Sequence, residues 1–275
     1  MSVFKLSLIN HMGQKWSTQS VGNLGKYKLY AGDIVVFSSL WDNGQENPFL
    51  KVGYHQIGHT FMVIHSEQMP MLRNIHQYLT IGECNHHGCL MNKPVRLENG
   101  QKPIEIFHFI GHPQIPTGVY QTQIRQIADN YDDKTRIEYP KIAELAQIYM
   151  KGSLKYNNKL QCKPFRLRSK FETLDIAFSK GKVVFTTELR NIMGRVVCSE
   201  FNAFIAQYAL WRSVTYLEQK HVQPMKAMSI VFEILPFANG AWPEDFSQMP
   251  EKYWTNIQLY VKTDYDLKPL PKIKF

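Results

Sequence analysis

Residues 198–210, Cys-Ser-Glu-Phe-Asn-Ala-Phe-Ile-Ala-Gln-Tyr-Ala-Leu, decide the fold expected for this chain. The run predicts an amphipathic helix with large apolar side chains on one side, and Cys198 opens it. The first backbone N–H groups of a helix have no partner within the helix, and the helix dipole is positive at that end. A thiol in this position is therefore biased toward the thiolate, the nucleophilic form of cysteine.

His59 opens a second informative segment, residues 57–64, Ile-Gly-His-Thr-Phe-Met-Val-Ile. The apolar residues after it predict a buried strand that would hold the imidazole rigidly. A histidine beside a cysteine can take the thiol proton and later return it to a leaving group. Cys198 and His59 thus predict a nucleophile and its base.

Glu83 is the residue expected to orient that base. It ends a predicted strand over residues 78–83, and a carboxylate accepting from one ring nitrogen fixes the tautomer and stabilises the imidazolium. His86 and His87 follow closely and are alternatives for the same role. The backbone N–H of Cys198 is expected to donate to an oxyanion, and no second donor is assigned.

A competing cluster, Cys84, His86, His87 and Cys89, falls within six residues. These residue types bind zinc, but structural zinc sites usually draw their ligands from two separated pairs. One short loop would be strained by supplying all four. We therefore expect a loop beside the active site, with no metal and no cofactor.

The composition predicts one packed domain. The chain has 275 residues, 44% of them hydrophobic, and a formal net charge of +9. The charge favours an anionic surface or substrate, but no basic block is long enough to predict nucleic-acid binding. Neither a cleaved signal nor a transmembrane stretch is recognised, so we expect a cytoplasmic location, or export without a cleaved signal, and reduced cysteines.

The remaining patterns predict an α+β domain over residues 1–275. Strands are expected at 34–37, 60–65, 78–83, 104–110, 231–235 and 257–261, and helices at 117–132 and 140–151. Residues 174–178 and 183–187 flank Ser-Lys-Gly-Lys and predict a hairpin. The stretch 117–190 is interpreted as a helical and hairpin insertion into the domain.

The order of four motifs resembles the permuted NlpC-type papain-like cysteine hydrolases, the YiiX/YebB-like group. The motifs are Gly-Asp-Ile-Val-Val-Phe at 32–37, Gly-His-Thr-Phe-Met-Val-Ile at 58–64, Ile-Gly-Glu at 81–83 and Val-Cys-Ser-Glu-Phe at 197–201. Residues 241–246 also resemble the Pro-Asp-containing turn that follows the cysteine helix. The resemblance covers roughly 27–110 and 195–250. It implies a circularly permuted papain-like fold with an antiparallel sheet against the cysteine-bearing helix.

The resemblance also implies catalytic roles for Cys198, His59 and Glu83. The function expected is that of a thiol-dependent hydrolase, an amidase, peptidase or lipid acyl hydrolase, acting on a peptide, a peptidoglycan stem or a lipid through an acyl-enzyme. Acyl transfer stays open, because proteins like lecithin:retinol acyltransferase are distant relatives of the group. The alternative is a catalytically silent fold that binds an anionic partner.

Overall fold

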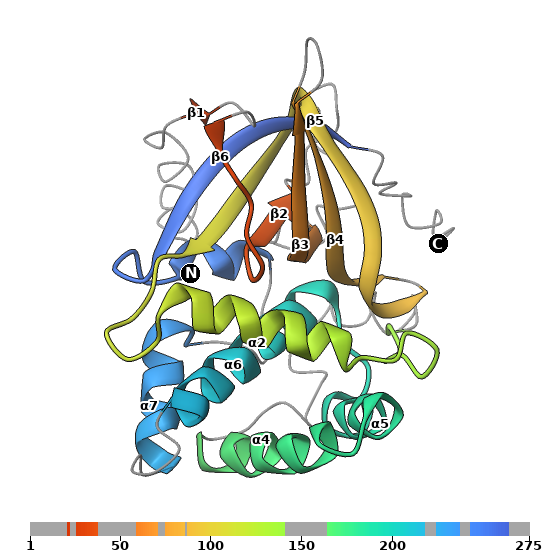
Figure 1. The fold of residues 1–275 in the computed structure, drawn as a ribbon, viewed down its shortest axis with the longest axis vertical. Coiled ribbons are helices and arrows are strands. Elements are labelled where there is room, and N and C mark those ends of the chain that lie inside the picture. Colours follow the sequence, from red (N-terminus) through yellow and green to blue (C-terminus); the bar gives the residue numbers. More distant parts are fainter. Residues whose placement is uncertain are drawn as a thin grey trace, which may run out of the picture.

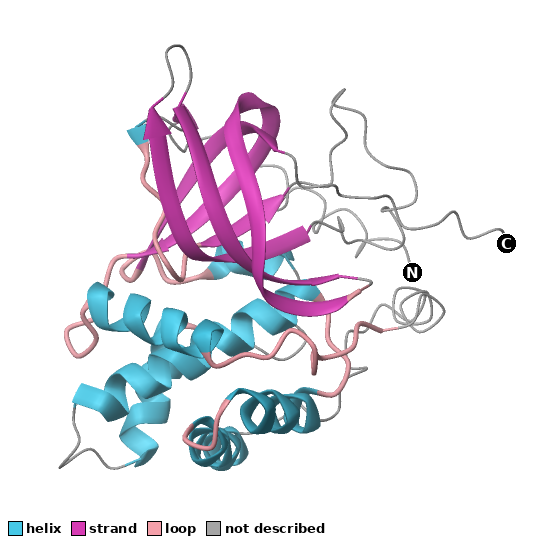
Figure 2. Cartoon of the chain, turned by 45° about the vertical axis from the view of Figure 1, so that its right-hand side comes forward, coloured by secondary structure: helices cyan, strands magenta, loops and turns pink. Residues whose placement is uncertain are grey.

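The computed structural model describes residues 21–22, 26–37, 59–70, 75–85, 87–140, 164–217, 224–236 and 243–263. It is an α+β protein in which a closed β-barrel stands against a group of helices (Figures 1 and 2). The strands are β1 (Val21–Gly22), β2 (Ile34–Phe37), β3 (His59–Pro70), β4 (Ile75–Asn85), β5 (Gly88–Phe109) and β6 (Trp254–Thr263). The helices are α2 (Thr117–Asp129), α4 (Pro164–Phe178), α5 (Lys182–Met193), α6 (Cys198–Leu217) and α7 (Pro224–Ile234), with a 3₁₀ helix η2 (Pro243–Gln248).

The barrel closes through β5, which is 22 residues long. The first half of β5 pairs with β4 and the second half with β2, while β3 lies between β2 and β4. β6 runs antiparallel along β5, and the short β1 pairs parallel with β6. β5 therefore closes the barrel by pairing with both β2 and β4, and all pairings except that of β1 are antiparallel.

Gly100 lies where the register of β5 against β6 shifts, between Asn99 and Lys102. A Cβ atom at this position would lie 2.3 Å from the backbone nitrogen of Lys262. The close approach of two backbones leaves room for glycine alone, and such irregularities bend a strand. This is the middle of β5, where the strand passes from one set of neighbours to the other.

Alternating strand residues form two hydrophobic cores. Residues on one face fill the barrel, among them Val35, Phe61, Val63, Ile81 and Ile106. Residues on the opposite face, such as Met62, Ile64 and Phe107, belong to a larger core shared with the helices. The period of two along each strand thus separates the barrel interior from the helix contact.

α6 lies at the centre of the larger core. It contacts β3, β4, α2 and α7, and most of its residues from Cys198 to Val214 are buried. The amphipathic character expected for this helix is wrong, because these neighbours cover it on several sides. In Figure 1, α2 and the start of α6 lie nearest the strands, and α4 and α5 lie farther away.

Several predicted elements are confirmed. The strands expected at 34–37, 60–65, 78–83, 104–110 and 257–261 are β2, parts of β3, β4 and β5, and part of β6. The expected helix at 117–132 is α2, and the antiparallel sheet does pack against the cysteine-bearing helix. The helix expected at 140–151 lies, apart from residue 140, outside the described residues.

Two predictions of β-structure are wrong. The hairpin expected at 174–187 is a pair of helices, α4 and α5, and the strand expected at 231–235 falls in α7. In α5 the buried residues Phe185, Leu189 and Ile192 recur at helical spacing, which outweighs the β-branched residues between them. The described helices of the 117–190 stretch share their core with α6 and α7; its status as an insertion stays a prediction.

Candidate functional site

The candidate site lies where the start of α6 contacts the start of β3 and the end of β4. His59 is the first residue of β3, Glu83 lies near the end of β4, and Cys198 is the first residue of α6. β3 and β4 are neighbours, with Phe61 opposite Glu83, and α6 contacts both strands. Residues far apart in the sequence are thereby brought together. His59 and Glu83 are 24 positions apart, and Cys198 follows both by more than a hundred positions.

Cys198 occupies the first turn of a helix that its own sequence caps. The carbonyl of Val197 accepts the first helical hydrogen bond, from the N–H of Phe201 at 3.0 Å. The Glu200 carboxylate reaches back to accept from the N–H of Val197 at 3.3 Å, as in a capping box. The N–H of Cys198 therefore has no partner within the helix, and the thiol lies at its positive end.

His59 contacts both other predicted residues. Its Nε2 lies 3.3 Å from Oε2 of Glu83, and its ring also makes a hydrogen bond with the Cys198 thiol. The His59 side chain is 16% exposed and that of Glu83 is fully buried. The structure thus brings together all three residues that the sequence singled out.

Glu83 has two further partners that the sequence did not reveal. Its Oε1 accepts from Nζ of Lys93 at 2.6 Å and from Nδ2 of Asn85 at 2.8 Å. Lys93 comes from β5, where no motif marked it, and its side chain is 30% exposed. These donors keep a buried carboxylate anionic and fixed while it faces the imidazole.

Each of the two reacting groups shifts the pKa of the other. Burial alone would lower the pKa of His59, but the Cys198 thiolate and then Glu83, by charge and hydrogen bonding, raise it to about 9. Burial alone would raise the pKa of the Cys198 thiol, but the His59 imidazolium and hydrogen bonds from Thr60 lower it. The arrangement therefore favours a thiolate–imidazolium pair over a neutral thiol and imidazole.

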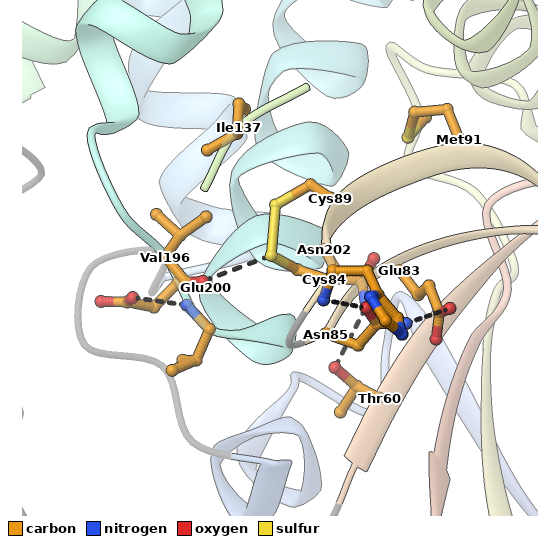
Figure 3. The surroundings of a disulfide bond; sticks show 12 residues. Thr60, Glu83, Cys84, Asn85, Cys89, Met91, Ile137, Val196, Glu200 and Asn202 are labelled. Carbon is orange, nitrogen blue, oxygen red and sulfur yellow. Dashed lines mark hydrogen bonds between the residues drawn. A yellow bond between two sulfur atoms is a disulfide. The ribbon is translucent and has the colours of Figure 1, made fainter. Parts of the chain in front are cut away.

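Thr60 and Asn202 complete the surroundings of the sulfur. Thr60 hydrogen-bonds to Cys198 through its main chain and its hydroxyl, and its Oγ1 accepts from Nδ2 of Asn202 at 3.0 Å (Figure 3). Asn202 lies four residues after Cys198, so it projects from the same side of α6. Neither residue was singled out in the sequence, but both could have been found from it: Asn202 by its spacing of four from Cys198, and Thr60 by its position directly after His59.

Cys84 and Cys89 form a disulfide across the β4–β5 turn, where they are register partners (Figure 3). The expectation that all cysteines are reduced is wrong for this pair, because the tight turn at Gly88 sets them opposite one another. A Cβ atom at Gly88 would lie 2.7 Å from the carbonyl oxygen of Ile137. Cys198 is a buried free thiol, and Cys162 lies outside the described residues.

The disulfide removes Cys84 and Cys89 from the competing cluster of possible zinc ligands. His87 is exposed, and its N–H donates to the Asn85 side chain, whereas His86 lies outside the described residues. Among the residues whose placement is described, no three His, Cys, Asp or Glu side chains gather as metal ligands would. The residue found against His59 is Glu83, so of the alternatives for orienting the imidazole, Glu83 has the observed contact.

Comparison with known proteins leaves the site to be interpreted from its geometry. No family model, curated protein or solved structure matches the chain. Within the described part of the chain, no helix combines the length and apolar character that crossing a membrane requires.

Proposed function

We propose that the protein is a thiol-dependent hydrolase that cleaves an amide or ester through an acyl-enzyme on Cys198. The observation that carries this proposal is the contact of Cys198 with His59 and of His59 with Glu83. A nucleophile, a base and a group that orients the base are the parts such chemistry needs. The order of these residues, with the cysteine last, supports a circularly permuted papain-like fold as part of the proposal.

In the acylation step, the Cys198 sulfur attacks the carbonyl carbon of the substrate. A C–S bond forms, the C=O electron pair moves to oxygen, and the N–H of Cys198 donates to that oxyanion. Collapse of this intermediate breaks the bond to nitrogen or oxygen, and the departing group takes the proton held by His59. Glu83 stabilises the imidazolium before the proton leaves.

In the deacylation step, His59 takes a proton from water, and the resulting hydroxide attacks the thioester carbon. The C–S bond then breaks, the sulfur leaves as thiolate, and the acid product is released. An amine or alcohol in place of water would give acyl transfer by the same route. The basic net charge of +9 favours substrates or surfaces that carry negative charge, such as peptidoglycan stems or lipids.

The test is acylation by p-nitrophenyl acetate, followed by intact-mass and peptide mass spectrometry. The expected result is an acetyl group on Cys198 and nitrophenol release, both lost in Cys198→Ser and strongly slowed in His59→Ala. His65→Ala is the matched control, because His65 lies on the same strand but is exposed. Equal acylation of Cys198→Ser, or none in the folded wild type, contradicts the proposal and favours a silent fold that binds an anionic partner.

A further inference from the structure

We infer that Thr60 is a thiolate-stabilising residue, whose hydroxyl and N–H hold the Cys198 sulfur while Asn202 directs the hydroxyl. The inference deepens the proposed function and rests on it. It adds a source of activation that does not depend on the His59–Glu83 pair.

Thr60 and His59 reach the sulfur from opposite faces of one strand. Side chains of successive strand residues point to opposite sides, so His59 and Phe61 share one face and Thr60 and Met62 the other. Both His59 and Thr60 nevertheless interact with Cys198, which places the sulfur at the very start of β3. Pairing of β3 with β4 begins at Phe61 opposite Glu83, so Thr60 lies one residue beyond that ladder. On the β2 side Thr60 is the register partner of Val36, whereas on the β4 side its main chain has no register partner and hydrogen-bonds to the sulfur.

Asn202 determines where the Thr60 hydroxyl proton goes. A hydroxyl has one proton to donate and two lone pairs with which to accept. Asn202 Nδ2 donates to Oγ1 at 3.0 Å, and this uses the accepting side of the hydroxyl. The proton then points to the remaining acceptor, the sulfur. The Asn202 side chain is fully buried and its Oδ1 has no hydrogen-bond partner in the structure, so it does not compete for that proton in this arrangement.

The charged groups around the sulfur do not replace this contribution. His59 from β3 opposes Cys198 with positive charge, but Glu83 from β4 partly neutralises it, and Lys93 from β5 is itself paired with Glu83. Glu200, on the same helix turn as Cys198, is buried and accepts from the N–H of Val197, so it donates nothing to the sulfur. Neutral donors stabilise the thiolate without adding a charge of their own.

The two hydrogen bonds that Thr60 donates to the sulfur affect two steps of the catalytic cycle. A well-stabilised thiolate is a weaker nucleophile for a given concentration, but it leaves a thioester more readily. Thr60 therefore favours the step in which the C–S bond breaks and the thiolate re-forms. It also keeps Cys198 ionised at a pH where ordinary thiols are protonated.

The test is the pH dependence of iodoacetamide labelling of Cys198 in the full chain, for wild type, Thr60→Val and Thr60→Ser. A hydrogen bond to a charged group is strong enough that its loss should raise the pKa of the Cys198 thiol by about one unit, so the labelling profile should move up by about one pH unit in Thr60→Val and hardly at all in Thr60→Ser. Thr186→Val is the matched control. Thr186 is equally buried and accepts from the N–H of Asp132 at 2.8 Å, so its loss should lower stability without affecting labelling.

A second measurement needs no variant at Thr60. The amide proton of Thr60 should move downfield in NMR spectra as Cys198 ionises, and alkylation of Cys198 should abolish that movement. A labelling pH profile of Thr60→Val that coincides with that of wild type, or a Thr60 amide that does not respond to the thiol, overturns the inference. Wild-type Cys198 that labels as slowly as an ordinary protonated thiol would instead overturn the proposed function, so the two failures are distinguishable.

Discussion

Replacement of Glu83 by glutamine should lower the pKa of His59 and destabilise the protein. The pKa of His59 is raised from 6.5 to about 9, which corresponds to about 3 kcal/mol in favour of the imidazolium. The Cys198 thiolate contributes more to this shift than Glu83 does. A hydrogen bond to a charged group contributes about 1.5–3 kcal/mol, and glutamine keeps part of it, so Glu83→Gln should lower the pKa of His59 by about one unit, which corresponds to about 1 kcal/mol.

The same substitution removes the partner of Lys93. Loss of one member of a buried ion pair costs about 3–5 kcal/mol, and the lower end applies here because the Lys93 side chain is 30% exposed and can turn toward water. The His59 part of the loss depends on pH. Since the folded pKa of His59 lies above the unfolded one, its stabilisation is fully present below about pH 6.5 and is lost as the pH rises through about 9.

The assay combines NMR titration of the His59 ring with urea unfolding below and above that window. The destabilisation by Glu83→Gln should be about 1 kcal/mol larger near pH 6 than near pH 10. Glu98→Gln is the control, because Glu98 pairs with His76 and Arg96 in the same sheet, away from Cys198. A His59 pKa unchanged by Glu83→Gln would refute the reasoning.

Four further outcomes are expected. Cys198→Ser should lower the pKa of His59 in an NMR titration, because it removes the larger of the two groups that raise it; an unchanged pKa would place the thiol elsewhere. Glu200→Ala should cost about 1 kcal/mol in urea unfolding through loss of the cap on Val197, and a neutral change would argue against that cap. Phe204→Ala should cost about 3–5 kcal/mol in the same assay, because its ring is fully buried against Phe171; a cost near zero would contradict the packing of α6. In the denatured chain, Cys84 and Cys89 should resist alkylation until a reductant is added, and immediate alkylation of both by mass spectrometry would show that they are not bonded.

The sequence predicted which three residues lie together better than it predicted the fold around them. β3 and β4 carry apolar residues at a clear period, and α6 follows Cys198 without interruption, so the three contacting residues lay on recognisable elements. Lys93 could not be found in this way. Its role depends on the register of β5 against β4, which no local pattern specifies.

Barrel closure and helix α7 were harder to predict, because the local sequence in each place resembles a different structure. The middle of β5, residues 98–103, reads Glu-Asn-Gly-Gln-Lys-Pro and resembles a turn, yet one strand continues through it by way of a bulge. In α7, the run Val-Phe-Glu-Ile-Leu at 231–235 imitates a strand. Ala227, Met228 and Val231 lie at helical spacing and are buried against the core, and this tertiary packing determines the outcome.

The proposed function depends on a thiolate–imidazolium pair of Cys198 and His59, and the pH dependence of Cys198 alkylation is the direct test of that pair. Iodoacetamide labelling should be followed by mass spectrometry in wild type, His59→Ala and the exposed-histidine control His65→Ala. A thiolate–imidazolium pair should give rapid labelling of wild type and His65→Ala well below pH 8, and a shift of the whole profile to higher pH in His59→Ala. A wild-type profile that rises only where ordinary thiols ionise, and that is unchanged in His59→Ala, would contradict it.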